Sequence, residues 1–343
     1  MRMSFLFSTV LTISFSLSLF SGLLYSSFVH SSPQAVSQNN LTWNSYPNDL
    51  QQFDYSADKL QRNWTQLAAA TNLPWPDAAF IQNIMTRFPL LSERLMSLAK
   101  QETSHPALKS ATIGNFQPLA LIVQQIWRLH FQGQYEEAYS LGSNIGPIGL
   151  GPALYTKLIY ITHLVPDPKE KERLLLEVDA TVKSILPYAK NYSFILFADS
   201  YQKARRLELM STTEASSSGL IDATQKRLRF LTEVDPGNPL YGVILAGIDV
   251  GIIERVGNFV GSMTYGADED ESISMFKKAL NSQPHLAVLY NEFALAMLRL
   301  DDSDYDLLLL DTLTKCVQLP TLSAEEALNK KSCRNLLNHL EIK

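Results

Sequence analysis

The residue types best suited to catalysis or metal binding are scattered along this 343-residue sequence. The histidines are His30, His105, His130, His163, His285 and His339. None of them stands at the spacing of a two-histidine metal motif, and no set of other obvious ligands flanks them. We therefore expect each to be a surface or helix-cap residue, and we predict neither a metal site nor a catalytic base.

Two other patterns are superficially similar to ion-binding and phosphate-binding motifs. The acidic run at 268–271 lacks the ligand spacing and the glycine of a calcium loop, and carboxylates at a helix start stabilise its positive end. Four glycines lie close together, namely Gly142, Gly146, Gly149 and Gly151. No hydrophobic strand precedes them and no Lys-Ser or Lys-Thr pair follows, so a turn between helices explains them better than a phosphate loop. The sequence predicts no cofactor and no enzymatic activity.

The sequence contains two cysteines, Cys316 and Cys333. We predict that they lie in consecutive helices, separated by a turn at Pro320 and a capping box of Ser323 and Glu326. If the helices pack antiparallel in an oxidising compartment, a disulfide would close a loop of about 17 residues and contribute about 3 kcal/mol. The alternative is two small buried apolar side chains.

Helices are expected to position these residues. The clearest helical pattern of the sequence lies in residues 268–320. Ser272, Phe276 and Ala279 follow one another at intervals of four and three, so they share one helix face. Pro284 then ends the helix, because its ring cannot continue the hydrogen-bond ladder. A small, a bulky and a small residue followed by proline is typical of the second helix of a tetratricopeptide repeat (TPR).

Two further helices continue the pattern. The helix after Pro284 has the apolar spacing of a repeat's first helix, with Tyr290, Phe293, Ala294 and Met297. The helix before Pro320 repeats the small–bulky–small positions with Leu309, Leu313 and Cys316. One repeat cannot bury its apolar face alone, so stacked copies are expected to share a continuous core.

Looser repeat features occur upstream. Gly133, Tyr135 and Ala138, in the run GQYEEA, indicate the turn and the second helix of a repeat. The best repeat features cover 119–151 and 222–320, and a capping helix is predicted at 323–340. The distance of 48 residues from Pro236 to Pro284 exceeds the roughly 34 residues of a standard repeat, so the array is irregular.

Residues from about 131 to 337 resemble a group of exported bacterial TPR-like proteins without an assigned biochemistry. The segments that carry the resemblance are GQYEEAYSLGSNIGPIGLGPALYTKLIY, ERVGNFVGSMTYGADEDESISMFKKALNSQP and AEEALNKKSCRNLL. More distantly, the arrangement is similar to the repeat domain of the regulator-of-microtubule-dynamics proteins and to the helical accessory subunit of periplasmic TRAP transporters. The resemblance implies an all-α, irregular TPR-like solenoid of antiparallel hairpins, and it supplies no catalytic residue.

The amino terminus has the pattern of a targeting segment. Arg2 is followed by an apolar run at 5–25, and no charged residue occurs between Arg2 and Asp49. Residues 1–37 are predicted to be a signal peptide, cleaved near 35–37, or a retained membrane anchor, together with the start of a linker. In both cases the body is exported to the periplasm, and membrane contact is expected only through this segment. A linker at 38–48 and a repeat domain at 49–343 follow.

Two segments are predicted to lack regular helix. The serine-rich run at 211–219 reads as a surface loop, and residues 256–268 read as a loop or irregular helix end that interrupts the repeats. We expect Phe259, Met263 and Tyr265 either to line a groove for a peptide or an apolar ligand, or to fill the space between long neighbouring helices.

The composition limits the class of partner. The net charge is −5 and no cluster of Lys and Arg exceeds a pair or so, which excludes the broad basic surface of a nucleic-acid-binding protein. We predict an exported TPR-like scaffold that binds a protein or peptide partner in the cell envelope. The alternative is a periplasmic transport accessory or carrier that holds a small apolar solute.

Overall fold

The computed structural model describes residues 43–341, and within them it contains helices and no strand. The predicted all-α class is therefore confirmed for this part of the chain. The predicted signal or anchor at 1–37 lies outside the described residues. Within 43–341, no helix combines the length and the apolar character needed to cross a membrane.

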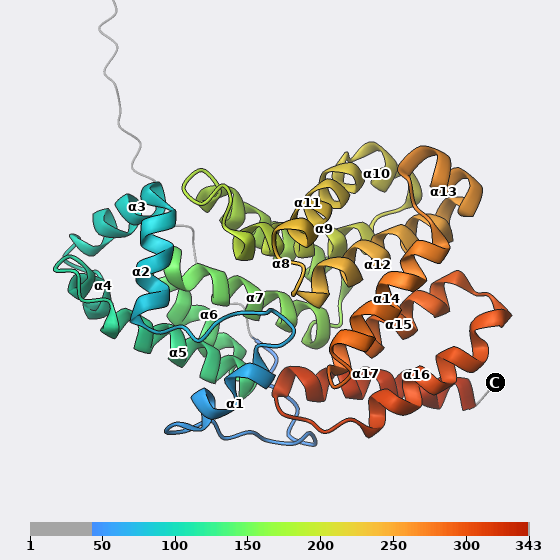
Figure 1. The fold of residues 1–343 in the computed structure, drawn as a ribbon, viewed down its shortest axis with the longest axis horizontal. Coiled ribbons are helices and arrows are strands. Elements are labelled where there is room, and N and C mark those ends of the chain that lie inside the picture. Colours follow the sequence, from blue (N-terminus) through green and yellow to red (C-terminus); the bar gives the residue numbers. More distant parts are fainter. Residues whose placement is uncertain (1–42, 342–343) are drawn as a thin grey trace, which may run out of the picture. The chain divides into compact units, whose positions relative to one another are not determined.

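The helices follow one another with short connections (Figure 1). They are α1 Lys59–Leu67, α2 Ala78–Arg87, α3 Pro89–Ala99, α4 Pro106–Ala111, α5 Gln117–Phe131, α6 Tyr135–Asn144, α7 Pro147–Leu164, α8 Pro168–Ile185, α9 Ser193–Leu209, α10 Thr212–Ser217, α11 Leu220–Val234, α12 Pro239–Val256, α13 Asn258–Tyr265, α14 Glu269–Ser282, α15 Ala287–Leu300, the 3-10 turn η1 Ser303–Tyr305, α16 Asp306–Gln318 and α17 Ala324–Glu341.

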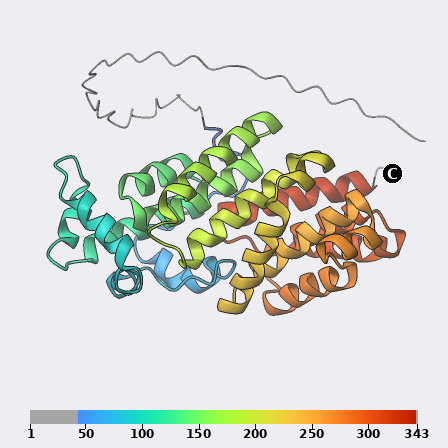
Figure 2. The same cartoon turned by 90° about the horizontal axis from the view of Figure 1, so that it is seen from above.

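Six of these helices form a closed cycle of contacts, and we call them the ring helices. They are α5, α7, α9, α12, α15 and α17. Each contacts the next, and α17 contacts both α5 and α7, so the series returns to its start. The other long helices, α6, α8, α11, α14 and α16, each contact two successive ring helices. Figure 2 shows the same helices from above, with α17 in red.

A buried polar contact holds the start of α17 to α5 and α7. Glu325 accepts a hydrogen bond from the Tyr155 hydroxyl at 2.8 Å, and its other oxygen lies 3.0 Å from Nε2 of His130. The second ring nitrogen of His130 lies 3.1 Å from the hydroxyl of Thr156. The prediction that His130 is a surface or cap residue is therefore wrong. Its side chain is 0% exposed because α17, distant in the sequence, covers it.

The segment before α1 packs on the same junction. The Trp43 ring lies 4.1 Å from the ring of Tyr160, between centroids, and Tyr46 is buried beside Gly133. Tyr55 donates a hydrogen bond to the carbonyl of Leu322, just before α17. In residues 43–48, the second half of the predicted linker, Trp43 and Tyr46 thus pack against the helices, whereas Asn44, Ser45 and Asn48 are exposed.

The residues chosen from the repeat pattern lie at helix–helix contacts. Gly133, with φ of +84°, makes the turn between α5 and α6, where a Cβ would come within 2.7 Å of the Tyr46 ring. The buried members of the set are Gly133, Tyr135, Ala138, Ser272, Phe276, Ala279, Tyr290 and Ala294. Pro284 is exposed after the end of α14, and its carbonyl accepts a hydrogen bond from the Tyr290 hydroxyl at 2.8 Å.

Two short helices replace predicted loops. Ser211 and Glu214 form a reciprocal capping box that starts α10, so the loop prediction for 211–219 is wrong. The S-x-x-E spacing was the sequence signal for this cap. Residues 258–265 form α13 rather than a loop or an irregular helix end, with Gly257 and Gly266 at positive φ on its two sides.

The two cysteines form a disulfide between α16 and α17, as one of the two predicted alternatives required. Their Cα atoms are 6.3 Å apart and both side chains are fully buried.

We expect the double variant Cys316→Ala, Cys333→Ala to lower the free energy of unfolding by about 3 kcal/mol, since the bridge closes a short loop of the unfolded chain. Urea unfolding followed by circular dichroism measures this change.

Reduction provides the control for that prediction. Dithiothreitol should destabilise the wild-type chain by a similar amount and leave the double variant unchanged. If the reduced wild-type chain unfolds at the same urea concentration as the oxidised one, the disulfide does not contribute to stability.

Candidate functional site

Two neighbouring cavities lie among the ring helices. The first, of about 510 Å³, lies mainly between α9, α12 and α15. The second, of about 200 Å³, lies between α7, α8, α9, α15 and α17. The side chains that line both cavities are Arg205, Glu208, Glu292, Leu295 and Arg299. These five residues form a partition between the cavities, and we call the four charged ones the partition cluster.

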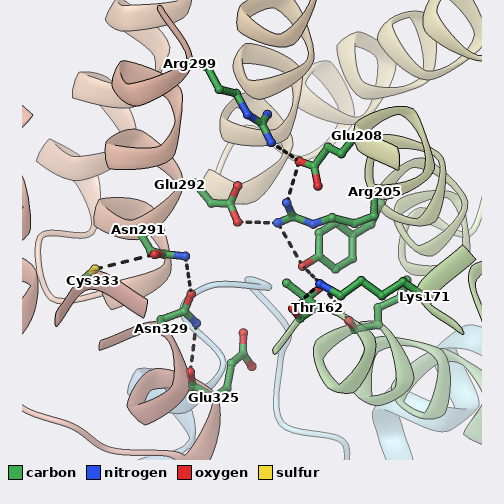
Figure 3. Close-up of polar contacts among 12 residues, drawn as sticks. Thr162, Lys171, Arg205, Glu208, Asn291, Glu292, Arg299, Glu325, Asn329 and Cys333 are labelled. Carbon is green, nitrogen blue, oxygen red and sulfur yellow. Dashed lines mark hydrogen bonds and ion pairs between the residues drawn. The ribbon is translucent and has the colours of Figure 1, made fainter. Parts of the chain in front are cut away.

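Arg205 is the centre of the partition cluster (Figure 3). One guanidinium nitrogen lies 2.9 Å from Glu208 on the same helix, and another pairs with Glu292 on α15. Arg299, one helix turn after Leu295 on α15, lies 3.0 Å from the same oxygen of Glu208. Only 12% of the Arg205 side chain is exposed. The cluster therefore joins α9 to α15 through charge-assisted hydrogen bonds away from bulk water.

The partition cluster favours the charged forms of Arg205 and Glu208. Burial opposes ionisation of Glu208, but the guanidinium groups of Arg205 and Arg299 hold the pKa of this carboxyl below its ordinary value. Burial likewise disfavours the charged form of Arg205, yet Glu208 and Glu292 hold its pKa well above the ordinary value. The Glu208 carboxylate and the Arg205 guanidinium are thus ionised at neutral pH.

The first cavity has an apolar wall on α12. Ile244, Ile248 and Ile252 follow one another at intervals of four, and Gly247 and Gly251 lie between them. A Cβ at Gly247 would meet no heavy atom of the neighbouring described residues within 4 Å, and a Cβ at Gly251 would approach only Arg299, at 3.9 Å. The two glycines therefore keep this side of the cavity open.

Charged groups of both signs face the first cavity. Arg255 and Glu254, at the end of α12, add to the partition cluster on its lining. Arg255 donates a hydrogen bond to the carbonyl of Leu207 at 2.7 Å, and Glu254 lies 4.0 Å from Arg299. The lining thus combines an aliphatic wall with paired charges.

The second cavity contains a cation outside these pairs. The Lys171 ammonium donates a long hydrogen bond, 3.4 Å, to the carbonyl of Thr162, and no ion pair joins it to a carboxylate of residues 43–341. Burial lowers the pKa of Lys171, and the nearby charge of Arg205 lowers it further. The neighbouring His163, half-buried, has its pKa lowered to about 4 by the same two causes. His163 is therefore neutral at neutral pH.

Two buried carboxylates elsewhere have structural partners. Asp179 on α8 accepts a hydrogen bond from Gln202 on α9 at 3.0 Å, and Asp249 on α12 accepts one from Gln225 on α11 at 2.6 Å. Burial raises the pKa of Asp249 to about 6. Each pair links neighbouring helices, and we assign both to packing. The described part of the chain contains no group of three side chains placed to hold a metal ion.

The predicted groove residues lie on α13, apart from both cavities. Phe259 is 77% exposed and Met263 is 74% exposed, so the alternative that they fill space between helices is wrong for these two. Tyr265 is half-buried and faces a shallow depression beside Arg229 and Phe230 of α11. The three residues therefore do not converge on one enclosed groove.

The partition cluster was missed at the sequence level, although part of it left a signal. Arg205 and Glu208 stand three apart, and Glu292 and Arg299 stand seven apart, so each pair lies on one helix face. Such pairs are common on solvated helices, and nothing in the sequence shows that the two faces meet. His163 and Lys171 were likewise not singled out as cavity residues.

Comparisons of the whole chain with family models, with curated proteins and with solved structures give no match in any of the three cases.

Proposed function

We propose that this chain is an exported, non-catalytic binding protein, in which TPR-like hairpins hold a segment of a protein or peptide partner in the first cavity. The cavity itself is the observation that carries the proposal. Its volume of about 510 Å³ lies in the usual range for ligand pockets, roughly 300–1,000 Å³. An aliphatic wall beside charges of both signs suits a peptide, whose side chains and backbone supply the same mixture.

The cycle of helix contacts supports a TPR-like arrangement of hairpins. Each bridging helix packs between two ring helices, as the second helix of a repeat packs between successive first helices. In this proposal the cavity lies on the face lined by first helices. The contacts of α17 with α5 and α7 then close the array, instead of leaving it an open solenoid.

The buried disulfide supports the location. Structural disulfides persist in oxidising compartments such as the periplasm, and the apolar run at 5–25 has the pattern of an export signal or anchor. We propose that the body lies in the periplasm, free or tethered to the inner membrane by that run.

A second candidate is a transport accessory or carrier for a small apolar solute. The row of isoleucines at 244, 248 and 252 favours it, because it gives the cavity one continuous aliphatic side. The charged residues on the opposite side count against a purely apolar occupant, since an apolar group placed there would leave them less well solvated.

The substitution Gly247→Leu tests the first cavity. The new side chain would project into it without meeting neighbouring atoms at Cβ, and a helix-interior glycine costs about 0.5–1 kcal/mol relative to alanine. We therefore expect an equal or slightly higher melting temperature and loss of the bound partner. Native purification of the full chain, with mass spectrometry of bound peptides, proteins and small molecules, measures the loss.

Gly242→Leu is the matched control, because Gly242 lies on the same helix with open space at its Cβ but does not line the cavity. It should keep the partner. Retention of the same partner by Gly247→Leu would contradict the proposed site. A lipid or solute released only from the wild type and the control would favour the carrier function.

A further inference from the structure

We propose that the second cavity is a separate site for a carboxylate attached to a short apolar group. This inference goes beyond the proposed function, since it concerns a different cavity and a defined ligand chemistry. The carboxylate could belong to a free short-chain acid or to the carboxyl terminus of a peptide, and the experiment below distinguishes these sources.

The charge balance of the cavity is the first argument. The cationic side chains on its lining are Lys171, Arg205 and Arg299, whereas the carboxylates are Glu208 and Glu292. His163 is neutral at neutral pH, and Glu254, which lies 4.0 Å from Arg299, lines only the first cavity, so the cations outnumber the carboxylates by one on the lining of the second cavity. One bound monoanion would balance this excess.

The geometry places the unbalanced charge on Lys171. Both carboxylates already pair with guanidinium groups in the partition cluster, while Lys171 reaches the cavity from α8 (Figure 3). The only hydrogen bond that its ammonium makes among the described residues is the long one to the carbonyl of Thr162. An ammonium has three donors, so Lys171 has donors available for an incoming anion. The half-buried position strengthens that interaction relative to bulk water.

Neutral polar groups complete the anion end of the site. Asn291 of α15 and Ser332 of α17 line the same cavity. The Ser332 hydroxyl is a donor, and the Asn291 amide, which donates one hydrogen bond to Asn329 at 3.4 Å, has a second N–H. His163 can donate through one ring nitrogen in its neutral form. The cavity thus offers donors from four helices: α7, α8, α15 and α17.

Apolar side chains and the small volume define the rest of the ligand. Ile161, Leu175, Leu209 and Leu295 line the cavity. The volume of about 200 Å³ is smaller than that of the first cavity and leaves room for a short apolar chain beside a carboxylate. A branched short chain, such as that of 3-methylbutanoate or of a terminal leucine, matches these dimensions and this lining.

Calorimetric titration of the full chain with 3-methylbutanoate tests the site, with 3-methylbutanamide as the uncharged analogue. We expect the acid to bind and the amide not to bind.

Lys171→Met should weaken acid binding about tenfold or more, because it removes a charge-assisted hydrogen bond. It should keep or raise the melting temperature, because it removes a buried charge whose pKa is already lowered. Lys169→Met, an exposed lysine of the same helix, should change neither.

A second variant and a spectroscopic signal keep the test independent of Lys171. Ser332→Leu fills the cavity from α17 without changing any charge and should also abolish binding. In proton NMR the pKa of His163 should rise when the acid binds, because an anion beside the ring favours its protonated form. Arg205, Lys171 and, from α17, Glu325 act on the charge of His163, and Arg299, Glu208 and Glu292 are the other charged groups on this lining. Lys169→Met should leave the shift in place.

Titration with the peptide acetyl-Ala-Leu, as free acid and as carboxyl-terminal amide, distinguishes a peptide carboxyl terminus from a free short-chain acid as the source of the carboxylate. Tighter binding of the peptide acid assigns the site to a peptide terminus, and tighter binding of 3-methylbutanoate assigns it to a free acid. Equal binding of acid and amide, unchanged binding by Lys171→Met, or binding of inorganic phosphate in place of the carboxylate overturns the proposal. A partner that is lost from Gly247→Leu while no carboxylate binds leaves the proposed function standing and removes only this inference.

Discussion

Replacing Arg205 by methionine should lower the free energy of unfolding by about 3–5 kcal/mol. The substitution preserves much of the side-chain volume but removes the counter-charge of Glu292, whose side chain is only 17% exposed, and one of two counter-charges of Glu208. A buried carboxylate left without its partner keeps its desolvation cost and loses the compensating attraction. Chemical denaturation at neutral pH, monitored by circular dichroism, measures the change.

The chain provides a matched control for this prediction. Arg173 also pairs with two glutamates, Glu170 and Glu177, but all three lie on one helix and the Arg173 side chain is 40% exposed. Arg173→Met should cost no more than about 1 kcal/mol, as for other exposed ion pairs. Equal effects of the two substitutions would show that the partition cluster is no more than a surface ion pair.

A double-mutant cycle separates the Arg205–Glu292 pair from the rest of the cluster. The double variant Arg205→Met, Glu292→Gln should be less destabilised than the sum of the two single variants, because it leaves no unpaired charge at Glu292. Strict additivity would mean that the two residues do not interact energetically, and it would remove the cluster as a link between α9 and α15.

Phe276→Ala should cost about 3–5 kcal/mol, the usual range for removing a fully buried phenylalanine. Phe276 of α14 is 1% exposed and stacks on Phe293 of α15, with ring centroids 5.0 Å apart. The cavity left behind would lie between helices that already bury small residues, Ser272 and Ala294, so little can move in to fill it. Urea unfolding gives the change in free energy directly.

Phe259→Ala is the same substitution on the exposed face of α13 and should change stability by no more than about 0.5 kcal/mol. A large cost at Phe259, or a small one at Phe276, would contradict the burial of these two side chains. Because Phe259 lies outside both cavities, its substitution should also leave the partner of the first cavity bound.

Local features of the sequence determined most of the helical architecture. Prolines and glycines mark the limits of helices, as at Pro284 after α14 and Gly133 between α5 and α6. The small–bulky–small spacing of Ser272, Phe276 and Ala279 identified a buried face, because residues three and four apart share one side of a helix. Two cysteines in consecutive helices joined by a short turn made a disulfide one of two alternatives, and the structure contains the disulfide. Each of these depends on interactions within about 20 residues.

The tertiary structure alone decided which polar residues meet. His130 and Glu325 are 195 residues apart, and Arg205 and Glu292 are 87 apart, so helical periodicity places each residue on a face but does not show which faces come together. The same reason explains the misassigned space-filling role of Phe259 and Met263: an apolar pair at helical spacing is buried only if another helix covers it. The contacts of α17 with α5 and α7, the two cavities and the position of Lys171 all arise from packing between distant helices.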